Sequence, residues 1–229
     1  YLRKEGHTVH HTPEKVDTEF IQDFDWIISF GYRHILSERQ LKAVDNRAIN
    51  LHISFLPYNR GSHPNYWSFI EGTPNGVSIH QIDKGLDTGG IYIQRHIKIN
   101  PALHTFKSSH KVLIGNIEEL FMSSYKEIFE GKLKVKPQVG KGTYHKSAQL
   151  PIIQNWNTNI KRYMEMKNRT DKEIIDEIEN IRTRNNVNWM DAVRLAFELA
   201  PERARSIFKD IKECDAKINE LLEELSDND

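Results

Sequence analysis

The sequence predicts an α/β domain with a mostly parallel sheet and flanking helices, followed by an all-helical C-terminal region. Three observations predict this division. Short apolar runs alternate with helical patterns over the first part of the chain, which is typical of a parallel sheet covered by helices. After about residue 155 only helical patterns remain. The charge changes there as well, because residues 160–229 contain 13 basic and 17 acidic residues, a net charge of −4, and the part before them carries +4.

The chain opens on a segment that lacks the strand expected at the start of an α/β domain. The letters YLRKEGHTVHH indicate the end of a helix, a stop at Gly6 and then a short strand. Since such a domain normally begins with a strand before its first helix, we expect the first strand to be missing. The sequence therefore predicts an N-terminally truncated domain over residues 1–155 and a helical region over 156–229.

Four apolar segments are predicted to be strands. Residues 25–30 (DWIISF) form a short apolar run that ends at Gly31, which is typical of a buried parallel strand. A second strand is predicted at 48–53. Two further strands, at 77–82 and 90–99, flank a glycine-rich loop.

Two helices are predicted between and after these strands. A helix over 37–44 begins with Ser37 as its N-cap and has Gln40 three residues later, the arrangement of a capping box. The longest helical pattern covers 106–129, where apolar residues recur at helical spacing, and Gly131 follows its end.

Three helix starts are predicted in the C-terminal region. Thr170 and Glu173 form a capping box for the first helix. Asn188 begins a second helix, with Asp191 three residues later, and Pro201 occupies the first turn of a third. The sequence leaves two roles open for this region, which are packing on the domain and forming a homodimer contact.

Composition disfavours several classes of protein. Basic and acidic residues are balanced at 32 each, so no excess of positive charge favours binding to nucleic acid. The single cysteine, Cys214, cannot form an internal disulfide, which fits a reducing compartment, and we expect a cytoplasmic protein. No apolar run approaches the roughly 20 residues that span a bilayer, so no membrane partner is expected.

No metal site is predicted. His7, His10 and His11 have no carboxylate or cysteine at ligand spacing. The segment that begins at Asp83 resembles a calcium loop only superficially, because its twelfth position is Gln94 rather than a bidentate glutamate.

Asn50 and His52 are the first pair of residues whose side chains could take part in a reaction. They are two residues apart near the end of a predicted strand, so both side chains point to one face of the sheet. In an open parallel sheet, ligands bind at the carboxyl ends of the strands. An amide can stabilise an oxyanion and an imidazole can move a proton, so the pair suits acyl transfer. For the pair alone, mutual hydrogen bonding at a strand end is the simpler interpretation.

A glycine-rich loop supplies the third polar group. Its glycines let the backbone turn sharply and approach a flat ligand closely. The residues that make this loop distinctive are Asp83, Gly85, Asp87, Gly89 and Gly90. Asp87 has the chemistry to orient His52 and to favour its protonated form. The contact between Asp87 and His52 is a geometric hypothesis.

Taken together, these motifs resemble those of the 10-formyltetrahydrofolate-dependent formyltransferases. The letters NLHISFLPYNRG carry the resemblance, followed by the Asp of GLDTG 37 residues after Asn50 and preceded by SFGYRHILS. The resemblance implies a Rossmann-like fold and a formyltransferase that uses N10-formyltetrahydrofolate as its formyl donor and needs no metal. It also implies that Asn50, His52 and Asp87 are the catalytic residues.

The resemblance implies two binding regions as well. SFGYRHILS looks like the segment that contacts folate through its backbone, and the glycine-rich loop would line the other side of the pterin. The residues implied to bind folate are Tyr32, His34, Ile35, Leu36, Asp83, Gly85 and Asp87. The letters LPYNRGSHPNYWSF and GKGTYHK look most like those of the sugar N-formyltransferases. The residues implied to bind substrate are Arg60, Gly61, His63, Tyr66, Trp67 and Tyr144.

Several alternatives stay open at this point. The aromatic residues at 63–67 are equally compatible with a core position, and GKGTYH is equally compatible with a hairpin turn. The leading acceptor is an amino sugar carried on a nucleotide, with lipopolysaccharide biosynthesis as its setting. Methionyl-tRNA, which the acidic tail disfavours, glycinamide ribonucleotide and hydrolysis of the formyl-folate rank below it. A non-catalytic folate-binding or scaffold protein is the alternative from another class.

Overall fold

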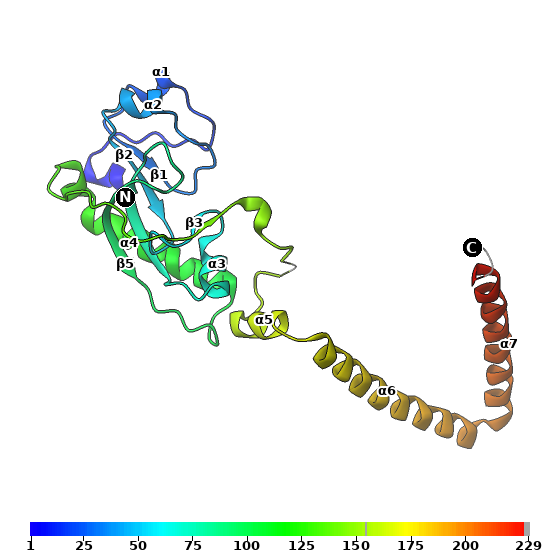
Figure 1. Cartoon of the computed structure of the whole chain (residues 1–229). Coiled ribbons are helices and arrows are strands. Elements are labelled where there is room, and N and C mark those ends of the chain that lie inside the picture. Colours follow the sequence, from blue (N-terminus) through cyan, green and yellow to red (C-terminus); the bar gives the residue numbers. More distant parts are fainter. Residues whose placement is uncertain (154, 227–229) are drawn as a thin grey trace. The chain divides into compact units, whose positions relative to one another are not determined.

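The computed structural model describes residues 1–153 and 155–226, and the chain divides into two compact units, Tyr1–Lys167 and Asn168–Asp229 (Figure 1). The first unit extends past the boundary predicted at residue 155, because helix α5 (Ile160–Lys167) belongs to it. Ile160 is fully buried in a cluster with Tyr66 and Phe106. The packing of α5 therefore moves the boundary, while the catalytic role of residues 1–155 stays a prediction.

The centre of the first unit is a four-stranded sheet in the order β1-β2-β4-β5. Its strands are β1 (Ile27–Ser29), β2 (Ala48–His52), β4 (Gly76–Gln81) and β5 (Ile91–His96). All four lie within segments predicted to be strands or begin one residue before them. The α/β architecture with a helical C-terminal region is thus confirmed.

The sheet is mixed rather than mostly parallel, so that part of the prediction is wrong. Strand β1 pairs with β2 in parallel, whereas β2 with β4 and β4 with β5 are antiparallel. The loop between β4 and β5 is one physical reason. Residues 82–90 are too few for a parallel connection, which needs a crossover of a dozen or more residues.

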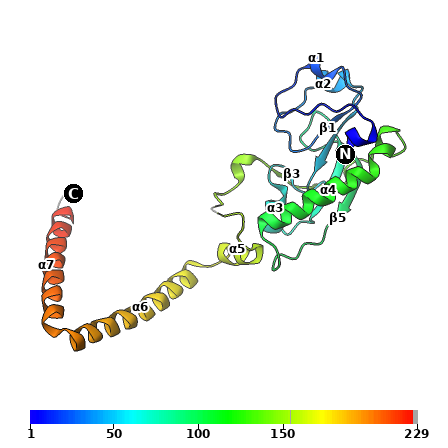
Figure 2. The same cartoon turned by 180° about the vertical axis from the view of Figure 1, so that it is seen from behind.

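Helix α4 (Phe106–Phe129) packs on one face of this sheet (Figures 1 and 2). Thr105 and Ser108 form the capping box that starts the helix. Side chains at alternate strand positions meet α4, because successive residues of a strand point to opposite faces. The buried core between sheet and helix comprises Ile49, Leu51, Val77, Ile79, Leu113, Ile117, Leu120, Phe121, Tyr125 and Ile128. The polar residues between them on the strands consequently lie on the other face.

Two short helices pack at the end of the sheet where β1 and β2 begin. They are α1 (Thr18–Ile21) and α2 (Glu38–Ala43), and the capping box of Ser37 and Gln40 is present at the start of α2. Their apolar residues form a second cluster, made of Ile21, Leu36, Leu41, Val44 and Ala48.

The N-terminal segment forms a 3₁₀ helix, η1 (Leu2–Glu5), which ends at Gly6 with a φ of 90°. The short strand predicted after Gly6 is absent from this part of the described chain. A strand requires a neighbour for its backbone groups, and β1 pairs only with β2 within the described sheet. The sequence pattern alone could not supply that neighbour.

A small two-stranded sheet stands beside the main one. Strand β3 (Arg60–Gly61) pairs in parallel with β6 (Tyr144–His145), and α3 (Pro64–Ile70) follows β3. The glycines of GKGTYH have positive φ angles and form the turn before β6. The segment therefore forms a parallel pair with a distant strand instead of the hairpin considered from the sequence. A short 3₁₀ helix, η2 (Ser147–Gln149), comes next.

The described residues of the second unit form two long helices, α6 (Asp171–Leu199) and α7 (Pro201–Ser226). The capping box of Thr170 and Glu173 is present, and Pro201 begins α7 as predicted. The helix start predicted at Asn188 is wrong, because α6 runs through that position. No glycine or proline interrupts α6, so nothing in its sequence breaks the helix there. None of the helices in the described residues is long and apolar enough to cross a membrane.

Candidate active site

A polar stripe crosses the face of the sheet that α4 leaves free. Asn50 and His52 of β2 lie on this face, directly opposite His80 and Ser78 of β4. The pairing arises because β2 and β4 both alternate apolar residues towards α4 with polar residues away from it. Two antiparallel strands thereby place an amide, two imidazoles and a hydroxyl side by side.

Asp87, which lies in the loop between β4 and β5, completes this group of polar side chains. Its Oδ1 accepts a hydrogen bond from Asn50 Nδ2 at 3.0 Å, and its Oδ2 accepts one from the Gly61 N–H at 2.8 Å. Nε2 of His80 lies 3.4 Å from Oδ1, and Nε2 of His52 lies 3.7 Å from Oδ2. The structure thus brings together Asn50, His52 and Asp87, as the sequence predicted.

The loop holds Asp87 firmly in place. The Asp83 carboxylate accepts hydrogen bonds from the Gly85 N–H at 3.0 Å and from the Thr88 hydroxyl at 2.7 Å. Nε2 of Gln138 donates to the backbone oxygens of Asp87 and Gly89, both at 2.8 Å. Asp87 itself has a φ of 53°, in the left-handed region that an aspartate tolerates better than most residues. These contacts fix the carboxylate before any ligand binds.

The tautomers of the two imidazoles follow from their carbonyl partners. Nε2 of His52 lies 3.1 Å from the Asn59 carbonyl oxygen, so Nε2 carries a hydrogen and Nδ1 is the nitrogen able to accept a proton. Nδ1 of His80 lies 2.8 Å from the Gln81 carbonyl oxygen and donates to it. In neutral His80, Nε2 can therefore accept from Asn50 Nδ2 at 3.3 Å.

Charge in the site is set by burial and by these contacts. Burial alone would raise the pKa of Asp87, but His52, His80 and the Gly61 N–H hold it well below its usual range. Burial lowers the pKa of His52, and the attraction of Asp87 offsets this only in part. Neutral His52 is consequently favoured near pH 7. Asp87 does favour the protonated form of His52, as predicted, but desolvation of the imidazolium outweighs the attraction of this one carboxylate.

We expect acid to destabilise the first unit in two stages. The folded-state pKa of His52 lies below its unfolded value of about 6.5, so its contribution to stability is complete above that pH. That contribution is lost as the pH falls through the folded pKa. Asp87 behaves likewise below an unfolded pKa of about 3.9. Thermal melts from pH 8 to pH 2 should show a falling Tm, and His52→Gln should flatten the first stage. Identical pH profiles for the two proteins would contradict this assignment.

The two segments predicted to bind folate lie together in the fold. Ile82, directly before the Asp83 loop, packs in the same cluster as Tyr32 and Leu36. The Tyr32 hydroxyl donates to the Glu14 carbonyl oxygen at 2.8 Å and accepts from the Val16 N–H at 3.1 Å.

The side chains of the first segment face in different directions. Leu36 is buried, whereas Ile35 is 72% exposed. His34 is exposed beside Tyr32, with a distance of 5.2 Å between their ring centroids. The segment therefore presents an apolar side chain to solvent on an anchored backbone.

Among the residues predicted to bind substrate, two belong to the polar group or its support. Gly61 contacts Asp87 through its N–H. Its φ is 86°, and a Cβ here would lie 2.3 Å from the His145 carbonyl oxygen, so only glycine fits. Arg60 donates to Oε1 of Gln138 through Nε at 3.0 Å and through Nη2 at 2.7 Å. Arg60 thus supports the loop of Asp87 through Gln138.

The aromatic candidates divide between core and surface. Tyr66 is 1% exposed, and its hydroxyl lies 3.1 Å from that of Tyr163, so the prediction that it contacts substrate is wrong. Helix α3 turns this ring into the cluster around Phe106. Trp67 is half-buried and stacks on His145, with 4.1 Å between ring centroids.

The remaining two candidates lie at the surface. His63 is exposed at the start of α3, and Tyr144 of β6 is 45% exposed. His63 stacks on Trp156 with 6.2 Å between ring centroids. Both remain available for contact with a substrate.

His80, Asn59 and Gln138 are site residues that the sequence analysis missed. His80 had a detectable signal, because Ser78 and His80 interrupt an apolar strand at alternate positions, as Asn50 and His52 do. Gln138 and Asn59 act through the backbone of other segments, and nothing in their sequence surroundings identifies them.

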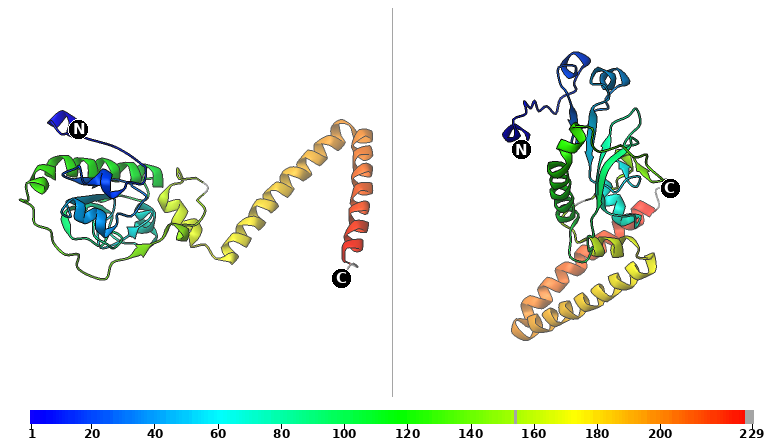
Figure 3. Two further views of the ribbon diagram at one scale, coloured as in Figure 1. Left: turned by 90° about the horizontal axis from the view of Figure 1, so that it is seen from above. Right: turned by 90° about the vertical axis from the view of Figure 1, so that its left-hand side faces the viewer.

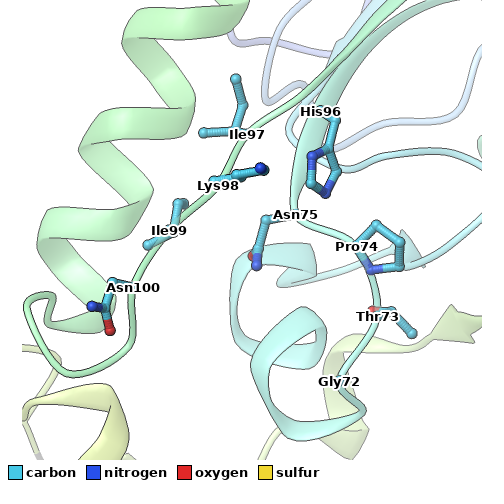
Figure 4. A pocket seen from close by; sticks show the side chains of 9 residues that line it. All are labelled: Gly72, Thr73, Pro74, Asn75, His96, Ile97, Lys98, Ile99 and Asn100. Atoms are coloured by element: carbon cyan, nitrogen blue, oxygen red, sulfur yellow. The ribbon is translucent and has the colours of Figure 1, made fainter.

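A separate surface pocket of about 510 Å³ lies between residues 72–75, which precede β4, and residues 96–100, at the end of β5 and just after it (Figure 4). Figure 4 shows the side chains of His96 and Lys98 near Asn75 and Pro74. The residues that line it are Gly72, Thr73, Pro74, Asn75, His96, Ile97, Lys98, Ile99 and Asn100. None of them belongs to the polar group of Asn50, His52, His80 and Asp87, so the pocket is distinct from that group.

Comparison with known proteins identifies similar chains. The family model described as formyl transferase matches residues 4–113. The structure of the formyltransferase PseJ from Anoxybacillus kamchatkensis, in complex with UDP-4,6-dideoxy-4-formamido-L-AltNAc and tetrahydrofolate, is similar with 38% identity and a TM-score of 0.65. The match covers 70% of this chain and 88% of that one. It confirms the predicted Rossmann-like fold.

Two curated relatives carry different names. A methionyl-tRNA formyltransferase from Thermodesulfovibrio yellowstonii is 33% identical over 158 residues, which cover 66% of this chain and 51% of that protein. A dTDP-4-amino-4,6-dideoxyglucose formyltransferase from Mycobacterium bovis is 30% identical over 156 residues, which cover 67% and 58% respectively. The chain thus spans between 51% and 58% of the length of these two relatives.

Proposed function

The chain belongs to the formyl transferase family, and we propose that it transfers a formyl group from N10-formyltetrahydrofolate to the amino group of a nucleotide-linked amino sugar. The observation that carries the proposal is the placement of Asn50, His52 and Asp87 together on the open face of the sheet, where Asn50 donates to Asp87 at 3.0 Å and His52 Nε2 lies 3.7 Å from the same carboxylate. An amide donor, a proton acceptor and a fixed carboxylate are the groups that transfer of an acyl group to an amine requires.

The residues present fit a folate donor. A flat heteroaromatic ring needs apolar contact on its faces and polar backbone groups at its edges. Ile35 and Leu86 present exposed apolar side chains from the two loops, 72% and 41% exposed respectively. The same loops are anchored to each other through Ile82, Tyr32 and Leu36. The folate would supply a formyl group whose carbon is bonded to N10. In the reaction the acceptor amine would take the place of N10 on this carbon.

We assign the steps to this chain's own residues as follows. As the amine nitrogen bonds to the formyl carbon, negative charge develops on the formyl oxygen. Asn50 Nδ2 carries two N–H groups: one is held by Asp87, and the other, which can donate to neutral His80 at 3.3 Å, turns to this oxygen. Nδ1 of neutral His52 takes the proton that the amine loses and returns it to N10 as the bond from carbon to N10 breaks. The balance is one formamide and one tetrahydrofolate, with no covalent bond to the protein.

The choice of an amino sugar rests on the extent of similarity. Here 88% of the PseJ chain is matched, whereas 51% of the methionyl-tRNA formyltransferase is matched. The charge also supports it, since residues 160–229 carry a net −4, and tRNA binding favours positive charge. Methionyl-tRNA is the second candidate, favoured by the 33% identity to that enzyme.

The direct test is an acceptor screen with N10-formyltetrahydrofolate. UDP-, dTDP- and GDP-linked amino sugars are compared with methionyl-tRNA and glycinamide ribonucleotide, and a sample without amine reports release of formate. Formylation of at least one sugar nucleotide is expected. Folate binding without turnover of any acceptor would instead support the non-catalytic alternative.

Asn50→Ala is expected to slow formyl transfer by about 10²–10³, the usual effect of removing one donor to a developing oxyanion. The side chain also bonds Asp87, so a melting curve should accompany the rate measurement. Asn116→Ala is the matched control, because Asn116 donates only to the backbone of its own helix at Val112. Near-wild-type transfer by Asn50→Ala would exclude its proposed role.

A further inference from the structure

Helix α7 carries an apolar seam at heptad spacing. The spacing alternates between three and four residues, and the seam is made of Ala204, Ile207, Ile211, Cys214, Ile218 and Leu221. Ala204, Ile211 and Ile218 occupy the a positions of the heptad, and the other three occupy the d positions. A seam of this kind packs against a second helix along one stripe, with knobs from one entering holes of the other.

The seam is largely uncovered in the described part of the chain. Ile207 is 50% exposed, Ile218 is 53% exposed and Leu221 is 61% exposed. Ala204 is buried close to the junction with α6, where Phe208 contacts Phe197 at 5.7 Å between ring centroids. Uncovered aliphatic side chains lose the stabilisation that burial provides, so a partner helix would stabilise the unit.

Helix α6 of the same chain does not cover the seam. Ala200 alone joins α6 to α7, whereas two antiparallel packed helices are usually joined by a loop of two to five residues. Figure 3 accordingly shows the two helices diverging from their junction. The rest of the α7 seam is left for a helix from elsewhere.

We infer that α7 pairs with α7 of a second copy of this chain, in antiparallel orientation, to form a homodimer. In that orientation each a residue faces a d residue of the second copy. Ile207 faces Ile218 and Ile211 faces Cys214 of the second copy, while Ala204 is already buried at the junction with α6. The small Cys214 thereby meets a large residue. A parallel pair would set Cys214 against Cys214, which leaves a thin layer with a cavity.

The charges that flank the seam select the same orientation. Asp210 and Lys217 both occupy g positions and are exposed. In the antiparallel pair, g positions face g positions, so Asp210 lies opposite Lys217 of the second copy, twice in the dimer. In a parallel pair, Asp210 would lie opposite Asp215 of the second copy, and like charges would repel.

Sedimentation of the full chain with charge variants tests the orientation. Asp210→Lys should raise the dimer dissociation constant by about three- to thirtyfold, because two surface ion pairs become repulsive. Lys217→Asp should do the same, and the double variant should return to within about threefold of the original chain. Lys209→Asp is the matched control, because its f position faces away from the seam. Circular dichroism confirms that each variant stays helical.

Three outcomes would overturn the inference. A tighter dimer with Asp210→Lys would indicate the parallel pair, since the introduced lysine would then face Asp215 of the second copy. An unchanged dissociation constant would show that this surface is not the interface. A chain that stays monomeric at every concentration would show that no dimer forms.

Disulfide trapping gives an independent readout. In a Cys214→Ser background, one protein carries Ile207→Cys and a second, distinguishable by mass, carries Ile218→Cys. Mild oxidation of the mixture should form the mixed disulfide, because these positions share a layer only in the antiparallel pair. Disulfides that form only between identical proteins would overturn the orientation.

Discussion

Replacing His52 by glutamine is expected to lower the kcat of formyl transfer by about 10²–10⁴ while the fold is retained. Glutamine can still donate to the Asn59 carbonyl oxygen, as His52 Nε2 does at 3.1 Å. It cannot accept a proton near pH 7, whereas Nδ1 of neutral His52 can. The substitution therefore removes the proton transfer and preserves the neighbouring contact.

Three measurements make this prediction specific. His110→Gln, on the exposed surface of α4, should leave the rate unchanged. Because burial lowers the pKa of His52, the rate of the original protein should fall on the acidic side of about pH 6.5, and the variant should lose that dependence. A variant that keeps both its rate and its acidic limb would show that another group moves the proton.

Asp87→Asn is expected to lower the rate by about 10² or more and to destabilise the first unit by about 1–3 kcal/mol. The carboxylate accepts from Asn50 Nδ2 and from the Gly61 N–H, with His52 and His80 close by. An asparagine offers one acceptor oxygen where these donors need two, and its amide N–H groups oppose the remaining donor. Asn50 and β3 should then shift, which misplaces the amide donor.

The control for this variant shares its backbone conformation. Asp45 has a φ of 50°, close to the 53° of Asp87, but its side chain is 85% exposed. Asp45→Asn should change neither rate nor stability by more than about 0.5 kcal/mol. In a double-mutant cycle, the effects of Asp87→Asn and His52→Gln on the rate should be less than additive, because the two residues share one network. Full additivity would argue that they act separately.

How much of the structure could be predicted from the sequence differs from one part of this chain to another. Strands and helices were predictable wherever a local signal exists, such as the apolar run before Gly31 or the capping box of Ser37 and Gln40. The antiparallel direction of β5 was predictable, because loop 82–90 is too short for a parallel crossover, whereas the antiparallel pairing of β2 with β4 depends on contacts that form only in the fold. The predicted helix start at Asn188 failed for a related reason, since a capping signature also occurs inside an uninterrupted helix.

The candidate site shows the same division. Asn50, His52 and Asp87 were recognisable from residue type and spacing, and the fold brings them within hydrogen-bonding range or close to it. The charge state of His52 could not be predicted from the sequence, because it depends on how deeply the imidazole is buried. Tyr66 likewise belongs to the core, which only the packing of α3 reveals.

The reactive groups, the α/β class and the family resemblance could all be read from the chain of letters, because they follow from residue types at short and regular spacings. The contacts that hold those reactive groups in place could not be read from the sequence. Gln138, Asn59 and the Gly61 N–H reach the site from separate segments. Such contacts form when the chain folds and loop 82–90 returns over β2. Long-range hydrogen bonds and burial depend on distance in space, and sequence spacing does not encode that distance.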